Sequence, residues 1–286
     1  MKTSLFVLVL VMMAGFATSA IAQEEAAVEV SSNWKLSGIT GINASQTTLV
    51  NWSAGGEDAV AGNFYLNGSL KYAKDKWAWD NDLILEYGLM YSSEYNTRKN
   101  ADKISFSSKL GYQITDKWYY SLLTDYNTQF AKGYDYPDKS KYLSTFMAPA
   151  YVNLALGVDH KPNDAFSFFL SPITMRTLFV MDDSLSAAGA YGIKPDKKTK
   201  IEAGALFKGS MKKEVTTNVD ITSKLDMFTP YSEDFGKVDV NWEMMLSMKI
   251  NEVLTTTLST SVRYYDREIT KVQFREIFGL GVAYRF

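Results

Sequence analysis

The stretch that decides the fold class is Arg275-Glu-Ile-Phe-Gly-Leu-Gly-Val-Ala-Tyr-Arg-Phe286, at the C-terminal end of the sequence. One parity carries Phe278, Leu280, Val282, Tyr284 and Phe286, and the other carries Ile277, Gly279, Gly281, Ala283 and Arg285. Alternate side chains of a strand point to opposite faces. The stretch therefore predicts a strand with one apolar, aromatic-ended face and one face that is small or polar, with Ile277 as the exception.

The same alternation recurs along the chain, in runs long enough to cross a bilayer as tilted strands. The clearest runs cover residues 83–91, 104–114, 238–250 and 254–264. We therefore expect an all-β fold, a transmembrane antiparallel up-and-down β-barrel of about twelve strands, with about ten or fourteen as alternatives. In such a barrel of the bacterial outer membrane, we expect Phe286 to end the closing strand and to be the signal that the barrel-assembly machinery reads.

Turn residues divide these runs into two classes of connection. Short turns rich in Asp, Asn and Lys are expected at 74–76, 115–117, 161–164, 194–197 and 251–252, because Asp and Asn bond their own backbone in turns. Longer polar loops are expected at 51–61, 92–102, 132–141, 182–186, 212–237 and 266–271. This asymmetry is typical of outer-membrane barrels. The weakest strands are centred on Leu170, which Pro172 interrupts, and on Ala190. Residues 214–227 alternate in part, and they either extend a hairpin outward or add a strand pair, which gives fourteen strands.

The N-terminal end predicts export. Lys2 precedes an apolar run over 5–16, and Ala20-Ile21-Ala22 resembles a signal-peptidase site. We expect residues 1–22 to be a signal peptide cleaved between Ala22 and Gln23, residues 23–33 to be a short periplasmic segment, and residues 34–286 to form the barrel. The expected location is the outer membrane of a Gram-negative bacterium, among its lipids and lipopolysaccharide, and we favour a monomer.

Composition narrows the alternatives. The 286 residues carry a net charge of −2 at pH 7, which argues against nucleic acid as a partner. The chain has no cysteine, so no disulfide can stabilise it. Its 18 Tyr, 16 Phe and 6 Trp suit a barrel, because aromatic girdles flank the apolar band of such a barrel. A soluble all-β sandwich is the alternative fold, but it does not account for aromatics at so many strand ends or for two classes of loop.

A signature near the start of the predicted barrel adds a family resemblance. The stretch from Asn43 to Asp58 resembles the S-Q-x-x-L-x-N-W-x-x-G-G-E signature of the Bacteroidota family of domain of unknown function 3078. The matching residues are Ser45, Gln46, Leu49, Asn51, Trp52, Gly55, Gly56 and Glu57. The resemblance implies an outer-membrane barrel but no activity and no catalytic residues. We expect the signature in a loop between the first two strands, either as a structural loop or plug or as a binding loop.

Charged residues on the non-lipid parity are expected in the lumen, since charge on the lipid face is costly. The candidate lumen charges are Lys71, Asp82, Glu86, Lys109, Asp125, Glu243 and Arg263. Their mixed signs leave two hypotheses open, which are a salt-bridged interior that closes the barrel and a polar channel for small solutes.

The sequence offers little chemistry for an enzyme. Its single histidine, His160, lies beside an expected short turn, and no nucleophile elbow or zinc-binding helix motif is present. We expect no catalytic residues, no metal and no cofactor. The leading hypothesis is a passive small-solute pore or a structural or accessory membrane component. A barrel that binds a ligand or partner through its extracellular loops comes second, and an outer-membrane enzyme comes third.

Overall fold

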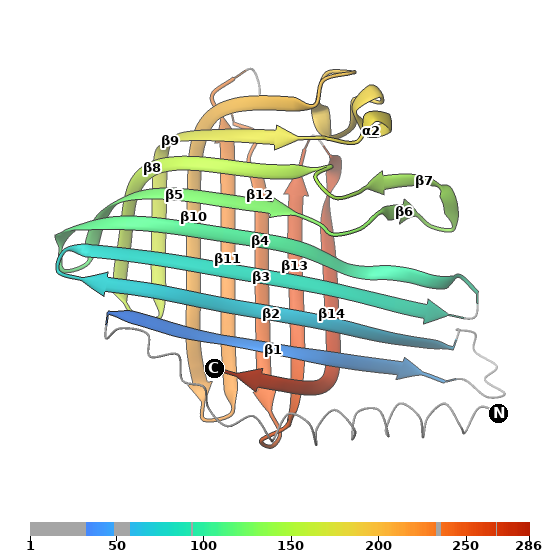
Figure 1. Cartoon of the computed structure of the whole chain (residues 1–286), viewed down its shortest axis with the longest axis horizontal. Helices are drawn as coiled ribbons and strands as arrows, with labels where there is room; N and C mark the ends of the chain where they lie inside the picture. The colour runs from blue at the N-terminus through green and yellow to red at the C-terminus, as the bar shows by residue number, and fades with distance from the viewer. Residues whose placement is uncertain (1–32, 49–57, 93, 233–235, 267) are drawn as a thin grey trace. The chain divides into compact units, whose positions relative to one another are not determined.

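The structure is a computed structural model, and it describes residues 33–48, 58–92, 94–232, 236–266 and 268–286 (Figure 1). Twelve strands close into one ring in the order β1-β14-β13-β12-β11-β10-β9-β8-β5-β4-β3-β2. Their bounds are β1 Trp34–Thr47, β2 Ala59–Lys74, β3 Trp77–Ser92, β4 Asn96–Thr115, β5 Trp118–Thr128, β8 Ala150–Asn163, β9 Phe166–Phe179, β10 Thr199–Thr216, β11 Val219–Pro230, β12 Asp239–Lys249, β13 Leu254–Tyr265 and β14 Ile269–Arg285. This confirms the predicted antiparallel barrel. The expected signal peptide and residues 23–32 lie outside the described residues.

Each strand pairs antiparallel with its neighbour along the chain, apart from two joins. The β6–β7 hairpin (Gly133–Asp135 and Asp138–Ser144) interrupts the chain between β5 and β8, which pair directly. The ring closes where β1 pairs with β14, from Ile39↔Arg285 to Ala44↔Leu280. Gly38 and Phe286 exchange both backbone hydrogen bonds, at 2.7 and 3.1 Å, so the pairing continues to the last residue.

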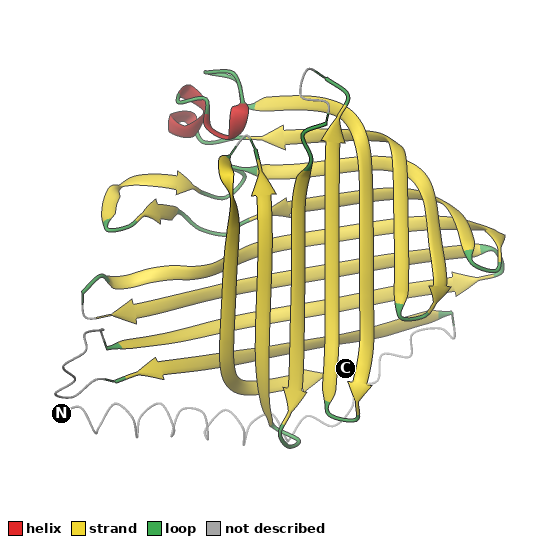
Figure 2. Ribbon diagram, turned by 180° about the vertical axis from the view of Figure 1, so that it is seen from behind, coloured by secondary structure: helices red, strands yellow, loops and turns green. Residues whose placement is uncertain are grey.

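The connections form two classes, as the sequence predicts. At one end of the barrel, the short-turn end, strands join at 75–76, 116–117, 164–165, 217–218 and 250–253. The other end, the loop end, carries β6, β7, the helix α2 (Asp183–Ala187) and the 3-10 turn η1 (Ala190–Gly192), seen beyond the strands in Figure 2. Asp75 has φ 53°, a left-handed conformation that Asp tolerates in tight turns.

Several sequence-based boundaries are wrong, although the strand count is right. Ala190 lies in η1 and not in a strand, and the expected short turn at 194–197 belongs to a loop-end connection. Residues 212–237 are not one loop, since β10 runs to Thr216 and β11 begins at Val219. The expected loop at 92–102 is short because β4 already begins at Asn96. The predicted strand at Ala190 is absent and β11 is present where a loop was expected, so the number of strands stays at twelve.

The outer face of the barrel is an apolar belt. Leu122, Leu156, Ile201, Phe274 and Phe278 point outward, with exposed fractions between 44% and 66%. Large aromatics gather on this face towards the short-turn end, where they include Trp77, Trp79, Trp118, Tyr120 and Tyr284. The inward parity is polar, because every strand alternates between the two faces.

A β-bulge explains how β9 contains Pro172. Ser171 pairs with Leu206 of β10 and Thr174 pairs with Gly204, so two β9 residues oppose Ala205 alone. Proline lacks an N–H and is tolerated in a strand at such a bulge. The Ser171 hydroxyl bonds the carbonyls of Leu156 and Ile173 and stabilises the irregularity, at 2.8 and 2.9 Å.

Candidate functional site in the ion-paired lumen

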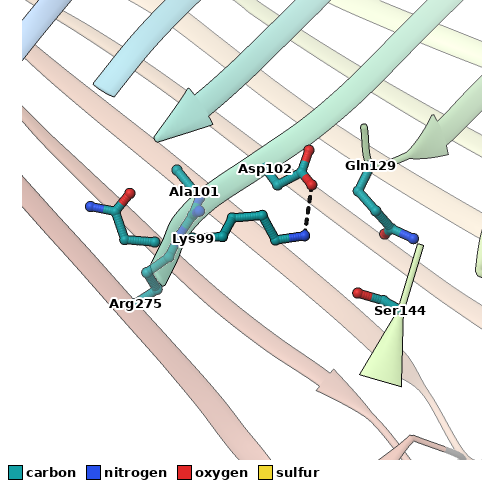
Figure 3. A pocket seen from close by; sticks show the side chains of 7 residues that line it. Lys99, Ala101, Asp102, Gln129, Ser144 and Arg275 are labelled. Atoms are coloured by element: carbon teal, nitrogen blue, oxygen red, sulfur yellow. Dashed lines mark hydrogen bonds and ion pairs between the residues drawn. The ribbon is translucent and has the colours of Figure 1, made fainter. Parts of the chain in front are cut away.

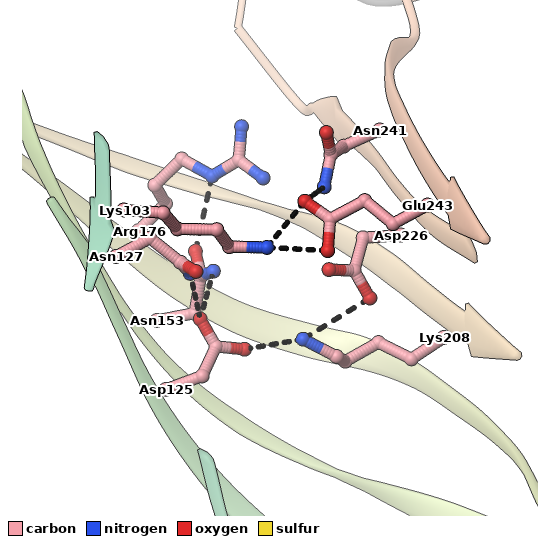
Figure 4. A network of polar contacts seen from close by, with 9 residues as sticks. All are labelled: Lys103, Asp125, Asn127, Asn153, Arg176, Lys208, Asp226, Asn241 and Glu243. Carbon is pink, nitrogen blue, oxygen red and sulfur yellow. Dashed lines mark hydrogen bonds and ion pairs between the residues drawn. The ribbon is translucent and has the colours of Figure 1, made fainter. Parts of the chain in front are cut away.

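The lumen is crossed by an ion pair between opposite strands. Lys103 on β4 and Glu243 on β12 have five strands between them in either direction around the ring. The Lys103 ammonium nevertheless contacts both carboxylate oxygens of Glu243 (Figure 4). The two long side chains therefore span the lumen at this level.

A larger polar network surrounds this pair. Lys208 of β10 reaches Asp125 of β5 at 2.9 Å and Asp226 of β11 at 3.1 Å (Figure 4). Asp125, only 1% exposed, also accepts from Asn153 at 2.8 Å. Arg176 donates to Asn153 at 3.0 Å. A buried charge is costly unless it is paired and hydrogen-bonded, and each of these carboxylates and cations has such partners.

Arg176 links the network to an apolar cluster inside the barrel. It pairs with Asp239 at 2.7 Å, and its guanidinium lies 3.7 Å from the ring centroid of Phe228. Phe228 belongs to a buried cluster of inward-facing residues, whose other members are Leu123, Ala155, Phe169 and Leu206. Apolar packing therefore fills the lumen along β5 and β8–β11, and the polar network lies beside it.

Further ion pairs connect strands that are not neighbours, and one lies within the β13–β14 hairpin. Towards the short-turn end they are Lys109–Asp159 (2.7 Å), Lys161–Asp80 (2.6 Å) and Arg285–Asp220 (2.8 Å). Towards the loop end they are Arg275–Glu86 (3.0 Å) and Arg263–Glu268 (2.5 Å). The structure thus pairs five of the candidate lumen charges: Glu86, Lys109, Asp125, Glu243 and Arg263. Lys71 has no ion-pair partner among the described residues, and Asp82 is hydrogen-bonded to Ser69.

Sequence reasoning missed most of the partners. Lys103, Arg176, Lys208, Asp226, Asp239 and Arg275 complete the pairs, but none was among the candidate lumen charges. Parity within β4 could have found Lys103, which shares the phase of Lys109. Which carboxylate it meets depends on strands far apart in the sequence.

The loop end carries a small cap over one side of the mouth. Residues Ala148, Leu178, Val180, Leu185 and Ile193 form its buried apolar cluster. Asp182 caps α2 by accepting from the Leu185 backbone N–H at 3.0 Å, and the Tyr142 hydroxyl donates to the same carboxylate. Burial acts to raise the pKa of Asp182, but these hydrogen bonds outweigh it and hold the pKa below its usual value.

A cavity of about 230 Å³ lies near this end (Figure 3). Its lining is Lys99, Asn100, Ala101, Asp102, Gln129, Ser144 and Arg275. Lys99 is held by Asp102 at 2.7 Å and by the Ala131 carbonyl at 2.8 Å, so its charge is compensated within the protein.

The signature is only partly described. Ser45 and Gln46 lie in β1, and Gln46 donates to the Thr48 hydroxyl at 2.8 Å. Asn51, Trp52, Gly55, Gly56 and Glu57 lie outside the described residues.

The histidine does not join the lumen network. The His160 ring packs at a tilt against that of Trp118, with ring centroids 4.3 Å apart. Within the described ranges, no group of three or more His, Cys, Asp or Glu side chains is arranged to hold a metal ion. No helix in that part of the chain is long and apolar enough to cross a membrane.

Comparison with known proteins supports the family resemblance. The model of the family described as "Protein of unknown function (DUF3078)" matches residues 44–134, which confirms the resemblance over this part of the chain. No curated protein matches the sequence.

Several solved barrels are similar in structure at low identity. The translocator domain of autotransporter NalP from Neisseria meningitidis is 8% identical, with a TM-score of 0.40 over 98% of this chain and 97% of that one. An outer membrane channel from Pseudomonas putida F1 is 12% identical, with a TM-score of 0.40 over 92% and 98%. The NanC porin is 9% identical, with a TM-score of 0.37 over 87% of this chain and 99% of that one.

Proposed function

We propose that the protein is a passive component of a bacterial outer membrane, a barrel whose lumen is closed at mid-height by ion pairs and not an open pore. The observation that carries the proposal is the contact between Lys103 and Glu243 across the ring. Apolar packing by Phe169, Leu206 and Phe228 beside that contact supports it, since it leaves only a narrow polar path.

The location is part of the same proposal. The apolar belt suits a lipid surround that includes lipopolysaccharide, and a closed ring leaves no strand edge exposed to it. We propose export with cleavage between Ala22 and Gln23, insertion by the barrel-assembly machinery, a monomeric state and no enzymatic activity. The DUF3078 resemblance suggests a Bacteroidota source.

Conductance in a planar bilayer tests the closed lumen. The wild-type barrel should show little steady conductance. The double variant Lys103→Ala/Glu243→Ala should conduct severalfold more, because it removes both side chains that cross the lumen. The charge swap Lys103→Glu/Glu243→Lys should return conductance to the wild-type level.

Lys139→Ala on β7 is the control, since this residue lies outside the barrel. A large steady wild-type current, unchanged in the double variant, would contradict the closed lumen and favour a small-solute pore.

The cap favours a second candidate, a barrel that binds a partner through its extracellular loops. Leu143, Phe146 and Met181 at the loop end are 46% to 54% exposed, beside the buried cap cluster. Deleting β6 and β7 should then abolish a surface interaction and leave conductance unchanged.

A further inference from the structure

Four lysines at the short-turn end of the lumen have no ion-pair partner among the residues that the structure describes. Lys35 on β1 and Lys71 on β2 are directly opposite each other, on the inward face. Lys212 on β10 and Lys224 on β11 lie on the inward faces of neighbouring strands, since Lys212 pairs with Thr222 and Lys224 with Ser210. We call these four residues the lysine layer.

Contacts across the lumen bring the layer together. The Lys212 ammonium donates to the Ser37 hydroxyl of β1 at 3.2 Å, although four strands separate β10 from β1 on the shorter path around the ring. Ser37 stands directly opposite Ser69, two residues from Lys71. The charges of Lys71 and Lys224 both act on Lys212. The lysines therefore surround one shared space.

The acidic side chains around this space do not neutralise the positive charge of the lysines. Asp220 is engaged by Arg285 at 2.8 Å, and Asp82 is bonded to Ser69. Glu214 lies at the rim, opposite Asp220. The nearby pairs Lys109–Asp159 and Lys161–Asp80 are each neutral. The four lysines, Arg285 and Lys249 at the rim face Asp82, Asp220 and Glu214, which leaves an excess of 6 − 3 = 3 positive charges.

This excess is unfavourable in the unliganded barrel. Like charges directly opposite on one face of a sheet are destabilising, as Lys35 and Lys71 are. Such a layer is stabilised when an anion lies between the ammonium groups. Lysine binds phosphate as a point charge, and hydrogen bonds between an ammonium and an oxyanion are among the strong ones.

We propose that the lysine layer is a binding site for a small polyvalent oxyanion, of the phosphate class, that enters the lumen from its short-turn opening. Lys35, Lys71, Lys212 and Lys224 supply the charge, and the Ser37 hydroxyl supplies a further donor. The site lies nearer to the short-turn end than the Lys103–Glu243 ion pair does. It does not depend on whether that ion pair blocks conduction.

Thermal unfolding of the full barrel in an uncharged detergent tests the site, with inorganic phosphate as the probe and sodium chloride at equal ionic strength as the reference. Phosphate should raise the wild-type Tm by several degrees, because a ligand that binds only the folded state stabilises it. Lys212→Gln should abolish that rise. It should also raise the Tm in chloride, since it relieves repulsion within the layer.

Lys74→Gln is the matched control, since Lys74 is an exposed lysine at the end of β2, on the opposite parity to Lys71, and it should keep the wild-type response. An equal phosphate effect in wild type and Lys212→Gln would overturn the proposal. Stabilisation by phosphatidylglycerol mixed micelles but not by inorganic phosphate would also overturn it, because it would place the anion on the lipid side. A wild-type Tm that phosphate leaves unchanged would do the same.

Discussion

At the scale of single residues, the closing contact of the barrel depends on a glycine. Phe286 pairs with Gly38, and its ring lies where a Cβ of Gly38 would be. Any side chain at position 38 must displace the ring. The alternation of the last strand predicted the apolar face of Phe286, but its partner could not be predicted, because β1 and β14 are the most distant strands in the sequence.

We therefore expect Gly38→Val to lower the yield of folded barrel, since it separates the Phe286 ring from β1. Gly68→Val is the control, because Gly68 is directly opposite Gly38 and its added Cβ would meet only Leu66 Cδ2, at 3.7 Å. Electrophoresis without heating should show the compact band reduced for Gly38→Val alone. Equal bands for the two variants would mean that the ring contact is unimportant.

At the scale of elements, the segment between β9 and β10 shows where sequence reasoning stops. A strand was expected around Ala190, but this residue begins the 3-10 turn η1, just after the helix α2 that Asp182 caps. Gly189, Tyr191 and Gly192 then adopt left-handed conformations, with φ of 66°, 61° and 74°. Short apolar segments do not by themselves distinguish a strand from a capped turn. By contrast, the alternation in β11 was visible in the sequence, but its charged residues favoured the prediction of a loop. The structure shows that two of them, Asp220 and Asp226, form ion pairs in the lumen.

The cap should loosen in acid. Because the pKa of Asp182 is lowered in the folded cap, its contribution to stability is present above the usual Asp pKa and is lost as the pH falls through the lowered value. Hydrogen exchange should show reduced protection of the Leu185 and Ser186 amides at low pH. Asp182→Ala should reduce that protection at neutral pH too, since loss of an N-cap typically costs about 1 kcal/mol.

Asp183→Ala is the comparison variant. The Asp183 side chain is 89% exposed, and its one ion pair among the described residues is with the exposed Lys198, so its removal should change protection little. If these amides are as well protected in the Asp182→Ala variant as in the wild type, the cap is held by its apolar cluster alone.

At the scale of the whole molecule, the division between an apolar outer face and a polar lumen is the part most fully readable from sequence. It follows from a period of two in each strand, which is a local property. The pairing inside the lumen is not local. Glu243 was placed on the inward face from its own strand, whereas Lys103 was not among the candidate lumen charges. Only closure of the ring brings the two side chains into contact.

The two faces should respond differently to charge. Leu85→Arg should prevent membrane assembly, because an Arg at mid-membrane on the lipid face costs about 2–4 kcal/mol. Glu86→Gln, one residue away on the inward face, removes a partner of Arg275 and should leave assembly largely intact. Outer-membrane fractions of cells expressing each variant should differ sharply in barrel content. Similar amounts would show that β3 does not present Leu85 to lipid.

The β1–β14 pairing bears on whether molecules of this protein associate with one another. It is the one join in the ring between strands from opposite ends of the sequence, so it has to form after both are made. Until then the sheet has two open edges, and each is a template for a strand of another chain. The hydrogen bonds between β1 and β14 close the barrel within one molecule. If they formed between two molecules instead, they would start a polymer. Closure at Gly38 and Phe286 is thus also a protection against self-association.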